Sequence, residues 1–230
     1  MRWLATIVLA LLGGFAGAAA WDYSGFGGES TRAYLLAHPE VLPEAVSRYQ
    51  ATQRMAQLAP VRSQLEMPFP GAVLGNPQGK VTLVEFSDYA CTYCRQSVAD
   101  VASLIEDNPD LRVVIREYPI LRPESVDAAR MALAAAQQGR YARFHDAMFE
   151  LGPPTAETIA AAARQAGVDL AKARAAIATG AFDTQLHANA ELAAQIGVSG
   201  TPGWVIGDQA LSGAVGRERI GDAIEEARRS

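Results

Sequence analysis

Two short apolar runs, at residues 81–87 and 111–118, constrain the fold of this chain more than any other feature of its sequence. The first run, VTLVEFS, is largely apolar on both faces, which is typical of a central strand that is covered on both sides. The second, LRVVIREY, is rich in β-branched residues, which favour strands. A helical pattern at 91–108 lies between them. The order strand, crossover helix, strand predicts a βαβ unit with a parallel pair of strands, and therefore an α/β fold.

A long helical stretch interrupts this α/β pattern. Residues at about 123–196 read as a series of helices, after which short strands are expected at 203–206 and near Ala210-Leu211. A last helix is predicted at 217–229. Because strands return after the helices, we interpret the helical block as an insertion into one α/β domain that spans residues 67–230.

Two cysteines, Cys91 and Cys94, follow the first predicted strand and open the helix after it. At a helix N-terminus the backbone N–H groups and the helix dipole stabilise a thiolate, so the favoured interpretation is a redox-active dithiol in which Cys91 attacks and Cys94 resolves. A purely structural disulfide is one alternative, although so short a loop would contribute only about 2 kcal/mol. Capture of a soft metal such as Cu(I) is the other. No metal site is predicted, because His38, His145 and His187 show no supporting spacing.

Composition and the first twenty residues indicate an exported globular protein. The chain is 50% hydrophobic and 20% charged, with a net charge of -5, which argues against nucleic-acid binding. Residues 1–20 combine Arg2, an apolar stretch and the small residues Ala18-Ala19-Ala20, the parts of a cleavable signal peptide. An uncleaved membrane anchor is the alternative. Export into an oxidising compartment would suit a dithiol that exchanges disulfides.

Residues 21–66 are interpreted as a helical extension and a candidate oligomerisation element. Within 31–65 a broken apolar stripe at helical spacing includes Leu42, Val46 and Tyr49, and Gln53 interrupts it. A helix of this length needs a partner for its stripe, either another copy of the chain or its own domain.

The pair Thr201-Pro202 directly precedes the predicted strand at 203–206. A proline at the head of a strand can take the cis form, which would leave the preceding backbone open to an extended peptide. An ordinary trans proline in a loop is the alternative.

Several motifs together resemble the DsbA-like branch of the thioredoxin superfamily. They are FSDYACTYC at 86–94, GVSGTP at 197–202, AAAQQGRYARFHDAMF at 134–149 and VLGNP at 73–77, so the resemblance spans roughly residues 73–229. The segment YLLAHPEVL at 34–42 is similar to the N-terminal extension of a subgroup of exported relatives, in some of which it drives oligomerisation. The resemblance implies a thioredoxin-like fold with an inserted helical domain, a periplasmic location and no cofactor.

The resemblance also assigns roles to residues. It makes Cys91 the nucleophile and Cys94 the resolving thiol of a redox-active disulfide, and Thr201-Pro202 a cis-proline loop that faces the dithiol and holds substrate backbone. Tyr93 is grouped with that loop as a substrate contact. Glu85, six residues before Cys91, corresponds to a buried acid that manages the Cys94 proton, since a desolvated carboxyl has a raised pKa. A salt-bridged or strand-edge glutamate is the alternative.

The residues between the cysteines depart from the family pattern. Many members have proline after the first cysteine and some have histidine next, whereas this chain has Thr92 and Tyr93. Tyr93 is uncharged at neutral pH and cannot stabilise a thiolate as an imidazolium does, so only the helix terminus remains for that task. Nearby, Asp88, Tyr89 and His145 are interpreted as turn and packing residues.

The predicted function is that of an exported thiol–disulfide oxidoreductase acting on protein thiols or disulfides, with a membrane thiol oxidase or reductase as redox partner. The dithiol alone fits an oxidase as well as an isomerase, and the extension favours an oligomeric isomerase. A thiol-based copper-binding protein on the same fold is the alternative from a different class.

Overall fold

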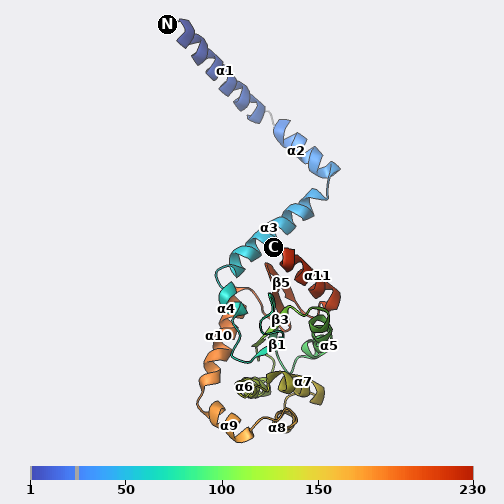
Figure 1. Cartoon of the computed structure of the whole chain (residues 1–230). Helices are drawn as coiled ribbons and strands as arrows, with labels where there is room; N and C mark the ends of the chain where they lie inside the picture. Colours follow the sequence, from blue (N-terminus) through green and yellow to red (C-terminus); the bar gives the residue numbers. More distant parts are fainter. Residues whose placement is uncertain (1, 24–25, 230) are drawn as a thin grey trace. The chain divides into compact units, whose positions relative to one another are not determined.

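The computed structural model describes residues 2–23 and 26–229, and the chain divides into two compact units, Met1–Gln50 and Ala51–Ser230. The first unit contains α1 (Arg2–Tyr23), α2 (Phe26–Ala37) and the N-terminal half of α3 (Val41–Leu58), up to Gln50 (Figure 1). Within the described residues, no helix has both the length and the apolar character to cross a membrane.

The second unit is built on a five-stranded mixed sheet of order β1-β3-β2-β4-β5. The central strands β2 (Val81–Ser87) and β3 (Leu111–Glu117) are parallel, and α5 (Thr92–Asp107) crosses between them. The predicted βαβ unit is therefore confirmed. Antiparallel neighbours complete the sheet: β4 (Gly203–Ile206) beside β2, β5 (Gln209–Ser212) beside β4, and β1 (Val73–Gly75) beside β3.

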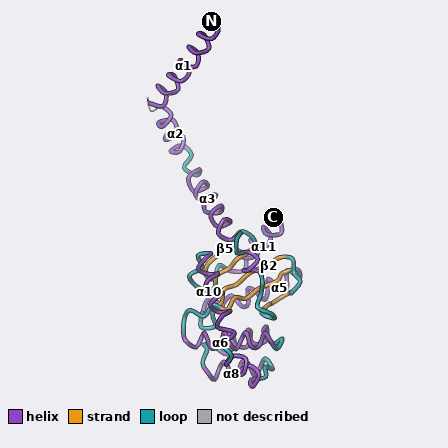
Figure 2. The backbone as a smooth tube through the Cα atoms, turned by 90° about the vertical axis from the view of Figure 1, so that its left-hand side faces the viewer, coloured by secondary structure: helices purple, strands orange, loops and turns teal. Residues whose placement is uncertain are grey.

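Five helices separate β3 from β4, as the sequence pattern predicts. They are α6 (Pro123–Gln137), α7 (Tyr141–Leu151), α8 (Ala156–Gln165), α9 (Leu170–Ala178) and α10 (Ala181–Gln195), and α11 (Gly216–Arg229) ends the domain. The alanine-rich face of α6 is buried, and its small side chains let neighbouring helices approach closely. Figure 2 shows α6 and α8 beyond one end of the strands. The α/β class with an inserted helical block and N-terminal helices is thus confirmed.

The two faces of the sheet have separate hydrophobic cores. Leu83 points into a core that contains residues of α5, α11 and the inserted helices, whereas Val84 and Phe86 point into a second core with α10. In Figure 1, α10 lies on one side of the sheet, and α5 and α11 lie on the other.

The second core also contains Leu58, Val61 and Leu65, from the end of α3 and from α4 (Arg62–Glu66) with its N-terminal flank. These residues retain 1%, 8% and 1% of their surface exposed. Here the structure differs from the predicted boundary at Met67, because residues 58–65 cover an apolar face of the sheet and belong to the second unit.

Candidate active site

Cys91 lies between β2 and α5 and is the N-cap residue of that helix. The backbone N–H of Cys94 donates a hydrogen bond to the Cys91 sulfur, with an N–S distance of 3.2 Å. N–H groups of the first helical turn and the helix dipole favour negative charge at this position. Both cysteines are free thiols, with 5% of Cys91 and 1% of Cys94 exposed. The dithiol therefore lies at the start of α5, with the Cys91 sulfur at the helix terminus and Cys94 in the first turn.

The loop before β4 faces this dithiol. Its Thr201-Pro202 peptide bond is cis. The Cys91 thiol donates a hydrogen bond to the carbonyl oxygen of Thr201, with an S–O distance of 3.3 Å. The antiparallel pairing of β4 with β2, in which Phe86 lies opposite Gly203, brings these distant segments together. The structure thus has the juxtaposition of Cys91 with Thr201-Pro202 that the sequence motifs predict.

Exposed apolar side chains lie close to the loop between β2 and α5, which leads to Cys91. Tyr93 is 60% exposed, and Ile120 and Leu121 are 43% and 50% exposed. The Asp88 carboxylate accepts the backbone N–H groups of Ile120 and Leu121 at 2.8 and 2.9 Å, and that of Ala90 at 2.8 Å. Asp88 is therefore the turn residue that the sequence predicts. Sequence reasoning did not single out Ile120 and Leu121, although two apolar residues just before Pro123 were a signal that it could have used.

Glu85 is buried in the middle of β2, with 3% of its surface exposed. Burial raises the pKa of its carboxyl group from 4.5 to about 8. Burial also raises the pKa of the Cys94 thiol, and the charge of Glu85 raises it further. The acid and the inner thiol therefore influence each other's protonation, and a carboxyl group with a pKa near neutrality can exchange protons with its neighbours.

Glu117, at the end of β3, is a second buried acid that sequence reasoning missed. Its Oε1 atom accepts hydrogen bonds from the hydroxyl groups of Tyr141 at 2.7 Å and Tyr89 at 3.2 Å. Burial raises the pKa of this carboxyl group also to about 8. In the sequence it looks like an ordinary polar residue at a strand end, and no spacing rule distinguishes it.

His145 of α7 completes this buried polar group. Its Nδ1 atom lies 3.3 Å from the Tyr89 hydroxyl, and burial lowers its pKa to about 4, so the ring is neutral near pH 7. It is the packed, hydrogen-bonded histidine that the sequence predicts. A cavity of about 340 Å³ is lined by His145, Asp146 and Glu85, with residues of β1 and α5. Glu85 and His145 thus face one cavity.

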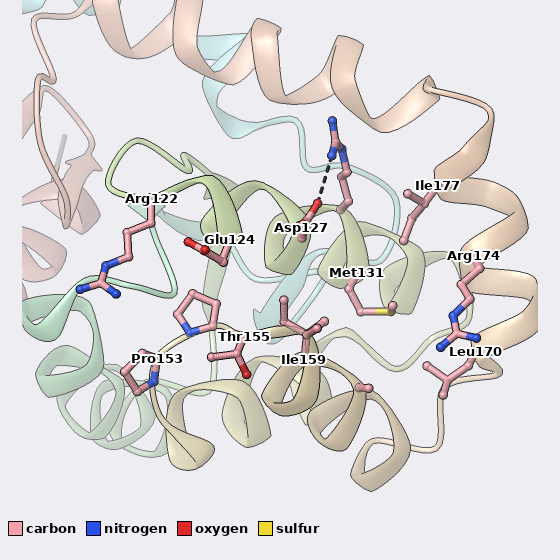
Figure 3. A pocket seen from close by; sticks show the side chains of 14 residues that line it. Arg122, Glu124, Asp127, Met131, Pro153, Thr155, Ile159, Leu170, Arg174 and Ile177 are labelled. Atoms are coloured by element: carbon pink, nitrogen blue, oxygen red, sulfur yellow. Dashed lines mark hydrogen bonds and ion pairs between the residues drawn. The ribbon is translucent and has the colours of Figure 1, made fainter.

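A different cavity, of about 540 Å³, is formed by the inserted helices and includes none of the predicted site residues. Figure 3 shows Met131, Ile159, Leu170 and Ile177 along it, with Arg122 and Arg174 towards opposite ends. Across the described residues, no group of three or more His, Cys, Asp or Glu side chains is placed to hold a metal ion.

Two family models match the chain. Residues 82–225 match the DSBA-like thioredoxin domain. Residues 31–56 match the N-terminal domain of the copper resistance protein ScsC. The two matches cover separate parts of the chain: the first covers the domain that contains the candidate active site, and the second covers part of the N-terminal helices.

Solved structures with the same fold include three bacterial proteins. A thioredoxin-like oxidoreductase from Silicibacter pomeroyi is 40% identical, with a TM-score of 0.66 over 69% of this chain and 92% of that one. A periplasmic thioredoxin-like protein from Salmonella enterica serovar Typhimurium is 27% identical, with a TM-score of 0.64 over 74% and 97%. The thiol-disulfide exchange protein alpha-DsbA2 from Wolbachia pipientis is 25% identical, with a TM-score of 0.70 over 77% and 97%. These likenesses confirm the predicted thioredoxin-like fold.

The chain spans between about an eighth and a quarter of the length of the curated relatives that it matches. These are described as Na(+)/H(+) antiporters, and the NhaA 3 protein of Salinispora tropica is 30% identical over 161 residues, 67% of this chain and 24% of that protein.

Proposed function

Because this chain belongs to the DSBA-like thioredoxin domain family of thiol–disulfide oxidoreductases, we propose that it forms or isomerises disulfide bonds in exported protein substrates. The observation that carries the proposal is the hydrogen bond of 3.3 Å between the Cys91 thiol and the Thr201 carbonyl. It joins a candidate nucleophile at a helix terminus to the backbone of a loop that would hold an extended substrate. Tyr93 is exposed beside the nucleophile and would contact the same substrate.

The chemistry of the dithiol is thiol–disulfide exchange. In the reducing direction the Cys91 thiolate attacks one sulfur of a substrate disulfide, that bond breaks, and the released substrate thiolate takes up a proton. Cys94 then loses its proton and attacks the Cys91 sulfur, so a Cys91–Cys94 disulfide forms and the second substrate thiolate leaves. Two electrons have passed from the dithiol to the substrate. Oxidation of a substrate is the reverse sequence.

Glu85 is proposed as the base that handles the Cys94 proton. Cys94 is nearly fully buried, and a thiol in such surroundings needs a proton acceptor before it can attack. A carboxyl group with a pKa of about 8 holds a proton in part of the population at neutral pH and accepts one in the rest. Both directions of exchange can therefore use the same group.

We further propose a periplasmic location, with removal of residues 1–20 as a signal peptide. The description of the Salmonella relative as periplasmic supports this location. Because exchange leaves the dithiol oxidised or reduced, a membrane thiol oxidase or reductase is the proposed partner that resets it.

Single cysteine variants test the proposal. Cys91→Ser should abolish insulin reduction and thiol oxidation, because the attacking sulfur is lost. Cys94→Ser should instead accumulate mixed disulfides with substrate proteins, which non-reducing gels and mass spectrometry would detect. Equal trapping by both variants would contradict the assigned roles, and unchanged activity of Cys91→Ser would contradict the function.

Capture of Cu(I) by the two thiols is the second candidate, and the match of residues 31–56 to the ScsC N-terminal domain favours testing it. Thiol titration with and without Cu(I) would separate the two functions. An exchange enzyme should reduce insulin without copper. A copper-binding protein should lose both reactive thiols on adding one equivalent of Cu(I) and show no insulin reduction.

A further inference from the structure

Two buried carboxyl groups lie on the same face of the central strands. In the parallel register Glu85 is opposite Ile115, and Ser87 is opposite Glu117. Side chains in register share a face, so Glu85 and Glu117 are diagonal neighbours on adjacent strands. They are 3% and 1% exposed. Two carboxyl groups this close, away from water, resist ionising together, because each negative charge disfavours the other.

Glu117 also reaches the loop that carries Cys91. Tyr89 lies two residues before Cys91, and its hydroxyl donates to Glu117 at 3.2 Å. A tyrosine hydroxyl has one proton, so when Tyr89 donates it to Glu117, the contact of 3.3 Å between its oxygen and His145 requires the Nδ1–H of His145 as donor. The bonds therefore run from His145 through Tyr89 to Glu117, and the cavity that His145 lines also reaches Glu85.

Other ionisable groups surround this pair. Tyr141 of α7 donates to Glu117, and the charge of Asp88, in the loop after β2, raises the pKa of Glu117. Cys94 of α5 faces Glu85. Asp146 of α7 and Glu106 of α5 line the same cavity as Glu85.

Among the described residues, no lysine or arginine side chain pairs with Glu85 or Glu117. The guanidinium of the neighbouring Arg116 instead donates to backbone carbonyls of α4 and of Met67, and to the Asn189 side chain of α10. From α10, the Asn189 amide donates to the backbone carbonyl of Glu117 at 3.0 Å and not to its carboxyl group.

We propose that Glu117 is a positioning residue for the dithiol, which anchors Tyr89 and shares one negative charge with Glu85. This inference rests on the proposed exchange function. Burial raises the pKa of both acids to about 8, which is consistent with a pair that changes charge near neutral pH. When Glu117 holds the charge, Glu85 is protonated and cannot accept the Cys94 proton.

The proton that Cys94 loses then follows a defined path. As Cys94 attacks the mixed disulfide, its proton moves to the Glu85 carboxylate, a Cys91–Cys94 bond forms, and the substrate thiolate leaves. Glu85 afterwards releases the proton to water in the cavity that it lines. A negative charge on Glu117 opposes ionisation of Glu85 and therefore moves this step to higher pH.

Glu117→Gln tests the inference, because the amide oxygen still accepts both tyrosine hydroxyls but carries no charge. The measurement is the rate at which the reduced protein forms its Cys91–Cys94 disulfide with oxidised glutathione, followed against pH. The midpoint of this profile should move lower by about one pH unit in Glu117→Gln. The control is Glu106→Gln, an exposed acid on the same cavity, which should leave the midpoint unchanged.

A second readout does not depend on exchange. The infrared carbonyl band of protonated buried carboxyl groups should disappear in two steps in the native protein and in one step, at lower pH, in Glu117→Gln. If Glu117→Gln is unstable, Tyr141→Phe should give a smaller shift in the same direction, since losing that hydrogen bond keeps Glu117 protonated to higher pH. A lower rate at every pH with an unchanged midpoint would overturn the inference. Absence of Cys91-dependent exchange with two-step infrared titration intact would overturn the proposed function alone.

Discussion

At the residue scale, Glu85 makes the stability of the fold depend on pH. Its pKa is about 8 in the folded protein and near 4.5 in the unfolded chain, because burial favours the neutral form. Below the lower value both states hold the proton, and stability is unaffected. Between the two values only the folded state keeps it, so the free energy of unfolding falls as pH rises, and the loss is complete above about pH 8.

Glu85→Gln should remove the part of this dependence that is due to Glu85, because glutamine imitates the protonated acid at every pH, whereas Glu117, whose pKa burial also raises, keeps its own part. Between acid and alkaline pH, the free energy of unfolding of the variant should rise by roughly 3 to 5 kcal/mol relative to that of the native protein, since each unit of pKa corresponds to about 1.4 kcal/mol. Urea unfolding of the reduced proteins at three pH values would measure it. Glu106→Gln, at an exposed position, serves as the matched control. Parallel stability curves for Glu85→Gln and the native protein would contradict the assigned cause.

The residues of the site differ in how far the sequence predicts them. Cys91, Cys94 and Thr201-Pro202 stand in recognisable motifs, and the predicted proximity of Cys91 to the Thr201-Pro202 loop is confirmed. Glu85 could be predicted only from its spacing to Cys91. Glu117 could not be predicted, because its environment depends on the register of β2 with β3 and on tyrosines from two other segments.

At the scale of elements, one buried cation holds α4 against the sheet. The guanidinium of Arg116 in β3 is 3% exposed and donates to the backbone carbonyls of Gln64, Leu65 and Met67. It also donates to Asn189 of α10 at 3.2 Å. Burial lowers its pKa to about 10, so it remains charged at neutral pH. Carbonyl dipoles take the place of a carboxylate partner, and they fix the segment that follows α3.

Arg116→Met should therefore lower the free energy of unfolding by about 3 kcal/mol, because several buried carbonyls lose their donor. Limited proteolysis should then cut between residues 58 and 67 faster than in the native protein. Arg112→Met is the matched control on the same strand, since Arg112 is only partly buried and bonds to one side chain, Thr82. Equal losses in the two variants would show that the carbonyl contacts carry no special weight.

Element prediction succeeds where a pattern is local. The central strands, the crossover helix and the inserted helices follow from periodicity and turn residues. Strand β1 is missed because three residues have no periodicity, and it forms only against β3. The burial of Leu58, Val61 and Leu65 is missed for a similar reason, since their partners lie in the sheet and in α10.

At the scale of the whole molecule, the two units have different surfaces. The unit Ala51–Ser230 contains the sheet, both hydrophobic cores and the dithiol. In α3 the apolar side chains of Leu42, Val46 and Tyr49 are 52%, 53% and 66% exposed. A stripe of this kind, interrupted by Gln53, is typical of a helix that meets partner helices. The assembly role predicted for the N-terminal helices stays a prediction. The structure moves the point at which the chain should be shortened for the test.

We expect a chain that begins at Trp21 to self-associate through these helices, and a chain that begins at Ala51 to be monomeric. Starting at Ala51 keeps Leu58, Val61 and Leu65, which a chain starting at Met67 would lose together with part of the second core. Light scattering would give the two masses. Both proteins should reduce insulin, because the dithiol and the cis-proline loop lie in the retained unit.

The activity that should depend on assembly is the rescue of scrambled disulfides, since several dithiols held around one misfolded chain can break and remake its bonds without losing it. A full-length variant with Leu42→Glu and Val46→Glu separates assembly from chain length, because the charges oppose contact between stripes while every residue of the second unit is kept. This variant should be monomeric, reduce insulin normally and fail to rescue scrambled substrate. If it is monomeric and still rescues, assembly is not the source of isomerase activity. If the native chain is itself a monomer, the extension has no assembly role, and an oxidase is the better description of the enzyme.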